Sequence, residues 1–170
     1  MSHFLRFVRT LALGAWVGAI VYFAAVVTRG AFAVLPSRDE AGLLVGFTLG
    51  GLHVMGLISA AIFVAASVAL TKSSRNSNRD ANGALRALIE PAVLGVILMA
   101  ALTIASQYYV IPRMAVLRGE MGSVDATPES DHRRAEFDRL HSVSVDLEGA
   151  VLVAGLVAMF LAVRETQPRS

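Results

Sequence analysis

A few polar side chains in the apolar parts of this sequence have the types and spacing that can do chemistry. His53 lies within the long run 41–70, which carries no charged side chain. His141, Ser144 and Glu148 recur at intervals of three and four residues, which places them on one stripe of a helix. Histidine and carboxylate side chains can exchange a proton or bind a borderline metal ion.

We expect these side chains to meet in one polar cluster. A polar group buried in hydrocarbon costs several kcal/mol unless it is paired, so His53 needs a partner. The expected members of the cluster are His53, His141, Ser144, Glu148 and Asp146. If the cluster holds a metal ion, His53, His141 and Glu148 are the expected ligands. The alternative is a network of hydrogen bonds between helices that binds no ligand.

The composition limits the class of protein that can carry such a cluster. Hydrophobic residues make up 55% of the 170 residues and charged residues only 16%, against about a quarter in soluble domains. The chain has no cysteine, which excludes thiolate catalysis, iron–sulfur clusters and cysteine-ligated zinc. The net charge is only +2 and no basic run is long, so we expect no nucleic-acid partner.

Four uncharged runs explain this composition. A helix that spans a membrane needs about 20 mostly apolar residues. The runs are residues 11–27, 41–70, 91–111 and 149–163. They predict an all-α fold, a four-helix transmembrane bundle that forms a single integral membrane domain over residues 1–170. The expected helices are 4–30, 38–71, 84–111 and 128–164.

Local signals set the expected ends of these helices. Ser37 and Glu40 have the spacing of a capping box, which predicts that a helix begins at residue 38. Pro112 predicts the end or a bend of the third helix, and Pro128 the first turn of the fourth. The second helix would be about 50 Å long, so we expect the second and fourth helices to extend beyond the membrane.

The basic residues give the expected orientation. With the N-terminus inside, eight Lys and Arg residues lie inside and seven outside. The long third connector lies outside in this arrangement, and it also carries six acidic residues. We therefore expect a multi-pass protein of a bacterial plasma (inner) membrane, with both termini in the cytoplasm.

Glycines recur at every fourth position in the first two predicted helices. Small residues at this spacing let helices approach closely in lipid. The glycines expected to pack helices are Gly14, Gly18, Gly42, Gly46 and Gly50. The same surfaces can bind a second copy of the chain, so a homo-oligomer or a membrane complex is expected.

Four short motifs, in order along the chain, resemble a known family. They are GAWVG at Gly14–Gly18, FAVLP at Phe32–Pro36, IPRM at Ile111–Met114 and F..LH..S at Phe137–Ser144. This order is similar to that in transmembrane protein 205-like proteins, whose bacterial members form the domain of unknown function 4149. The resemblance implies a compact four-helix membrane domain and no established catalytic activity. It also implies Asn one turn beyond the serine, where this chain has Glu148.

Three functions are compatible with these features. The leading interpretation is a small non-enzymatic membrane protein that assists transport or metal and stress tolerance through an outward-facing cluster of histidine and carboxylate. The alternative is a structural or assembly subunit of a membrane complex with no ligand of its own. The third is a haem-binding or redox protein that would use His53 and His141. The expected partner in all three is the lipid bilayer, and no cofactor is expected beyond a metal ion.

Overall fold

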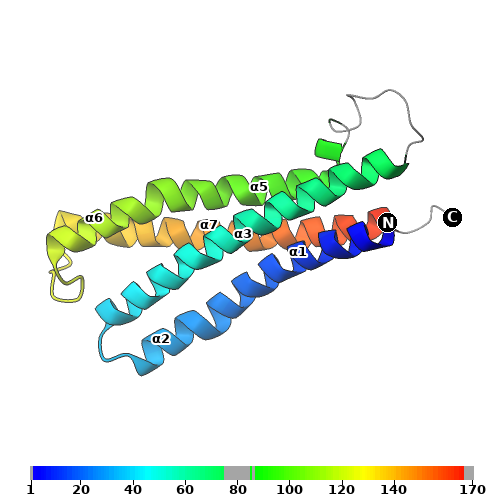
Figure 1. Ribbon diagram of the computed structural model, residues 1–170. Helices are drawn as coiled ribbons and strands as arrows, with labels where there is room; N and C mark the ends of the chain where they lie inside the picture. Colours follow the sequence, from blue (N-terminus) through cyan, green and yellow to red (C-terminus); the bar gives the residue numbers. More distant parts are fainter. Residues whose placement is uncertain (1, 75–84, 86, 167–170) are drawn as a thin grey trace.

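Four long helical rods make up the protein in the computed structural model, which describes residues 2–74, 85 and 87–166. No strand occurs among these residues. Each rod is long and apolar enough to cross a membrane. The result is a multi-pass, four-helix membrane protein, which confirms the expected all-α fold (Figure 1).

Two of the rods contain a short π-helical segment, in which the backbone hydrogen bonds are one residue longer than in an α-helix. The first rod consists of α1 (Ser2–Tyr22), the π-helix η1 (Phe23–Thr28) and α2 (Arg29–Val34). The second rod is α3 (Arg38–Ser74). The third rod consists of α5 (Pro91–Ala105), the π-helix η2 (Ser106–Val110) and α6 (Ile111–Met121). The fourth rod is α7 (His132–Thr166).

The start of α3 confirms the capping signal. The backbone N–H of Glu40 donates to the Ser37 hydroxyl over 3.1 Å, which satisfies one of the free donors at this helix end. With 37 residues, α3 is about 55 Å long, well beyond the roughly 30 Å of a hydrocarbon core. The rod therefore tilts or extends past the membrane.

The fourth helix begins four residues later than the predicted start at 128. Pro128 lies in the preceding turn, where its carbonyl accepts the N–H of Asp131 over 3.0 Å. The carboxylate of Asp131 then caps the helix, because it accepts the backbone N–H of Arg133 over 2.8 Å. An aspartate cap thus decides where α7 begins, rather than the proline.

The third helix also differs from the predicted range 84–111. Residue 84 lies outside the described residues, and the main helix begins only at Pro91. The helix continues past Pro112 to Met121. Proline has no backbone N–H to donate, and the π-helical turn η2 just before it shifts the hydrogen-bonding pattern so that the helix accommodates the proline. It ends instead at Gly122, whose φ of +72° is in the left-handed region that glycine adopts most readily.

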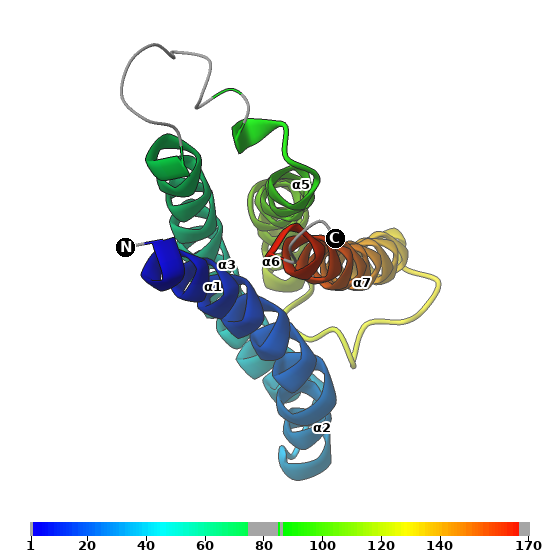
Figure 2. The ribbon, with the colours of Figure 1, turned by 90° about the vertical axis from the view of Figure 1, so that its right-hand side faces the viewer.

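The rods are arranged as two pairs. Figure 2 shows α1 beside α3 on one side and α5 beside α7 on the other. Both α1 and α7 have their terminal ends at the same end of the bundle (Figure 1). Trp16, Phe63 and Met99 are among the largest buried side chains of the core that joins the pairs. Gly56 makes room for Trp16, since a Cβ on this glycine would lie 2.3 Å from the indole Nε1.

Most of the glycines expected to pack helices do not do so within the chain. A Cβ added at four of them would meet no atom of the described residues within 4 Å, namely at Gly14, Gly18, Gly46 and Gly50. Only Gly42 of the predicted set has a neighbour, the Arg118 guanidinium at 2.8 Å. The close approaches occur instead at Gly56, Gly95 and Gly155. Small-residue spacing indicates a smooth helix face without showing what covers it, so packing at those four positions stays a prediction that concerns contacts outside the chain.

Polar contacts close the bundle at each end. At the end opposite the termini, the Asp39 carboxylate of α3 accepts the Ser123 hydroxyl over 2.5 Å and the Val124 N–H over 3.0 Å. These bonds tie the α6–α7 connector to the start of α3. At the end where the termini lie, Arg9 of α1 contacts Glu90 over 3.5 Å and stays buried. The two ends thereby hold the helix pairs in register.

Candidate functional site

His53 is the ionisable residue of the apolar run 41–70 in α3, and only 2% of its surface is exposed. It lies one turn before Gly56 and so on the face that meets the rest of the bundle. Both ring nitrogens have partners. A histidine that is buried and hydrogen-bonded through both nitrogens has a fixed ring orientation.

The partners of His53 come from two other helical segments. Its Nδ1 lies 2.8 Å from Oε1 of Gln107 in η2, and its Nε2 lies 2.5 Å from Oε1 of Glu148 in α7. Because α3 belongs to one helix pair and the other two segments to the second pair, these bonds bridge the two pairs. We call His53, Gln107 and Glu148 the polar triad.

The three side chains lie at one level of the bundle. His53 and Glu148 each lie about four helical turns beyond the start of their own helix, α3 or α7. Gln107 lies about four turns before the end of α6. At 1.5 Å of rise for each residue, all three are therefore about 21 to 24 Å from the end opposite the termini. The match follows from α3 and α7 running parallel, with the third rod antiparallel to both.

The hydrogen bonds limit where protons can reside in the triad. The carbonyl oxygen of Gln107 accepts, so Nδ1 of His53 must carry a hydrogen. Nε2 then either donates to an ionised Glu148 or accepts from a protonated one. Both arrangements have no net charge and differ only in the position of one proton. A pair of this kind can hold a proton without leaving an isolated charge in hydrocarbon.

The π-helical turn η2 places Gln107 in this contact. A π-turn advances the helix face by an extra residue, and such turns occur often at functional sites. The neighbouring Ser106 is completely buried, and its hydroxyl has no hydrogen-bond partner among the described residues. Gln107 was not among the predicted site residues. The available signal was its amide within the uncharged run 91–111, since a polar side chain in lipid needs a partner.

The structure brings together only part of the predicted cluster. His53 and Glu148 meet as expected, and Ser144 is buried one turn before Glu148. His141 and Asp146 are exposed on α7, and the described residues provide neither with a polar contact to His53. A ligand-binding role for the wider cluster stays a prediction.

The positions of these side chains also limit how the described residues could bind a metal ion or a haem iron. Within the described part of the chain, no three His, Asp or Glu side chains are grouped so that they could hold a metal ion. Both nitrogens of His53 are already hydrogen-bonded, so a metal or iron bond to this ring would require one of those contacts to break. His141, the other expected ligand, is exposed on α7 and does not reach the triad.

The fold and site define a class: a four-helix integral membrane protein with a buried polar triad between its helix pairs. The chain belongs to the family described as "Domain of unknown function (DUF4149)", whose model matches residues 11–123. The match includes His53 and Gln107 and ends before Glu148. Comparisons with curated proteins and with solved structures gave no match.

Proposed function

We propose that this protein is a proton-responsive membrane protein that assists transport, with the polar triad as its proton-binding site. The observation that carries the proposal is the 2.5 Å contact of His53 with Glu148 across the two helix pairs. Adding or removing one proton changes this contact between the pairs. The expected consequence is a change in their spacing, which is how a small bundle can couple protons to a conformational step.

The surroundings of the triad support proton exchange with the side opposite the termini. Gln107 is six residues from Arg113, or about 9 Å along the helix, so water is close on that side. On α7, Asp146 and His141 are exposed just beyond Glu148 in the same direction. Exposed carboxylate and imidazole groups can pass protons toward a buried acid.

Several finer statements belong to the same proposal. We place the protein in a bacterial inner membrane with both termini in the cytoplasm, since basic residues favour that orientation. The side opposite the termini is then the outside. We also propose a non-enzymatic role, similarity to transmembrane protein 205-like proteins, and self-association through the open glycine faces of α1 and α3.

Distances between spin labels test the proposal directly. The chain has no cysteine, so Phe47→Cys on α3 and Val145→Cys on α7 give a clean label pair at exposed sites. We expect the distance between the labels, measured by pulsed electron resonance in nanodiscs, to differ between about pH 5 and about pH 8, on either side of the ordinary histidine pKa. Glu148→Gln should remove this change, while the control Glu120→Gln, which replaces an exposed acid near the end of α6, should keep it. An unchanged distance in the parent protein would refute the proposal.

The alternative function is a structural subunit in which the triad only fastens the helix pairs. The observation that favours it is that the triad is closed, since both ring nitrogens of His53 already have partners. This alternative predicts one fixed label distance at both pH values. It also predicts a loss of stability when Glu148 is replaced, without any pH-dependent movement.

A further inference from the structure

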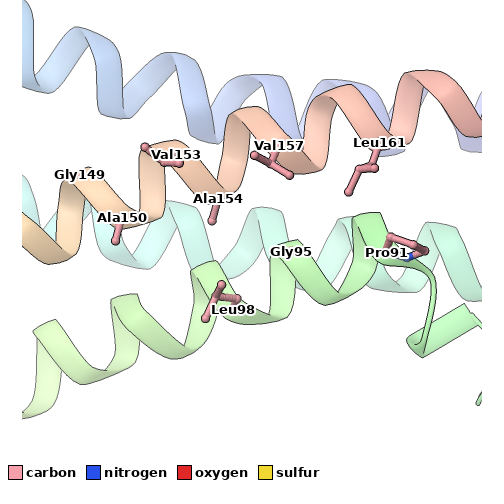
Figure 3. Close-up of a pocket in the computed structure, with 9 residues that line it drawn as sticks. All are labelled: Pro91, Gly95, Leu98, Gly149, Ala150, Val153, Ala154, Val157 and Leu161. Atoms are coloured by element: carbon pink, nitrogen blue, oxygen red, sulfur yellow. The ribbon is translucent and has the colours of Figure 1, made fainter.

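A shallow apolar groove runs along the surface between α5 and α7. It has a volume of about 490 Å³ and its wall is almost entirely carbon. Figure 3 shows Leu98 of α5 facing Ala150 and Ala154 of α7 along its length, with Pro91 and Leu161 at one end. Most of the side chains around it, including Leu98, are exposed on the surface of the chain. The groove therefore opens toward the membrane rather than into the bundle.

The groove has the length of one leaflet. From Gly149 to Leu161 it follows α7 for about 18 Å, at 1.5 Å of rise for each residue. Half of a hydrocarbon core measures about 15 Å. Gly95 makes the groove possible, because a Cβ there would lie 3.0 Å from that of Ala158, so α5 and α7 approach closely at its floor.

A cationic side chain continues the groove at the end where the termini lie. Val157, Leu161 and Arg164 follow one another at intervals of four and three residues, which places them on one stripe of α7. Arg164 lies about 4.5 Å of helix rise beyond Leu161 and is exposed. Its guanidinium stacks on the ring of Phe160 at 5.7 Å, which holds it at the surface beside the groove.

We propose that this groove binds one anionic phospholipid of the surrounding bilayer, with an acyl chain along α5 and α7 and the phosphate on Arg164. The occupant follows from the match of three features: an apolar wall, the length of one leaflet and a guanidinium at the polar end. A guanidinium recognises phosphate through charge-assisted, two-point hydrogen bonds. An unfilled groove in lipid would lose dispersion contacts along its whole length, so a flexible chain is favoured there.

Native mass spectrometry of the full chain, released from nanodiscs, tests the site. The probes are phosphatidylglycerol, which is anionic, and phosphatidylcholine, which is zwitterionic. We expect one phosphatidylglycerol to stay bound per chain. Arg164→Gln should lower its retention about fivefold, the effect of one cationic side chain at a membrane surface. The matched control Arg6→Gln removes an exposed charge at the same end of the bundle and should retain the lipid.

A second pair of variants tests the groove itself. Ala150→Leu fills it and should remove retention of both lipids, whereas Ala15→Leu, on the exposed face of α1, should not. Equal retention of the two lipids by the parent protein would overturn the proposal. So would equal retention by the Arg164 and Arg6 variants, or an Ala150 variant that dissociates a dimer instead of losing lipid, since the occupant would then be a second copy.

Discussion

The contact between His53 and Glu148 allows a prediction of how much the free energy of unfolding changes when one of the two side chains is removed. Glu148→Ala removes the carboxylate that Nε2 of His53 contacts at 2.5 Å, in a place where His53 is only 2% exposed. Removing one partner of a fully buried ion pair costs about 3–5 kcal/mol in soluble proteins. Hydrogen bonds between membrane helices are worth less, about 0.6 kcal/mol on average and about 1.7 at most, because the unfolded state in lipid finds other partners.

We expect the free energy of the His53–Glu148 contact to lie near the upper end of the range for hydrogen bonds between membrane helices. The bond is short and involves a carboxylate, yet the Glu148 side chain keeps 16% of its surface exposed, which lowers the cost below that of a dry pair. We therefore expect a double-mutant cycle of His53→Ala and Glu148→Ala to give a coupling free energy of about 1.5 kcal/mol.

The assay is unfolding by a denaturing detergent, followed by tryptophan fluorescence. Trp16 is the only tryptophan of the chain and is 1% exposed, so its emission reports loss of the core. The matched control is the cycle of His53→Ala with Asp146→Ala, which removes an exposed acid two residues away from Glu148. A coupling for Glu148 no larger than that of this control would refute the reasoning.

Three further predictions concern packing, the connector and pH. Gly56→Ala should lower the free energy of unfolding by about 1–3 kcal/mol because the new Cβ would collide with the buried indole ring, whereas Gly46→Ala, with open space around it, should be neutral or slightly stabilising in the same assay. Asp39→Ala should release the α6–α7 connector and raise its rate of cleavage by an added protease, measured against the parent protein. Hydrogen bonds from Arg133 lower the pKa of Asp131 to about 2 from its usual 3.8, so the stability from this charge is present above about pH 4 and lost as the pH falls through about 2. Asp131→Asn, which still caps α7, should flatten that part of the stability–pH curve, and an unchanged curve would contradict the assignment.

Periodicity and composition predicted the parts of the fold that depend on lipid. Long uncharged runs predict membrane helices because lipid leaves no other way to satisfy the backbone, and the capping box at Ser37 set the start of α3. The start of α7 could not be predicted in the same way, because Pro128 and Asp131 are both residue types that start helices, and the local bond from the Arg133 N–H to the Asp131 carboxylate decides between them. The continuation past Pro112 depends on a π-turn, which has no sequence signature.

The candidate site was predicted in two of its three members. The need of a buried histidine for a partner pointed from His53 to the acid at the edge of the fourth apolar run, Glu148. Gln107 was not predicted because helical periodicity shows which residues share a face of one helix, but not which residues of another helix lie opposite that face. His141 shares its stripe with Glu148 yet is exposed, about two turns nearer the start of α7, because a shared stripe on one helix does not show which of its residues a neighbouring helix covers.

We infer that His53 and Glu148 hold one proton between the two helix pairs. Nitrogen-15 magnetic resonance of the histidine side chains, in the protein reconstituted in bilayers, measures this proton at the ring itself. We expect that the Nε2 signal of His53 shows a strong hydrogen bond, differs from that of the exposed His141, and moves when Glu148 is replaced by Gln. An Nε2 signal of His53 that coincides with that of His141 and stays unchanged in the Glu148→Gln variant would contradict this inference.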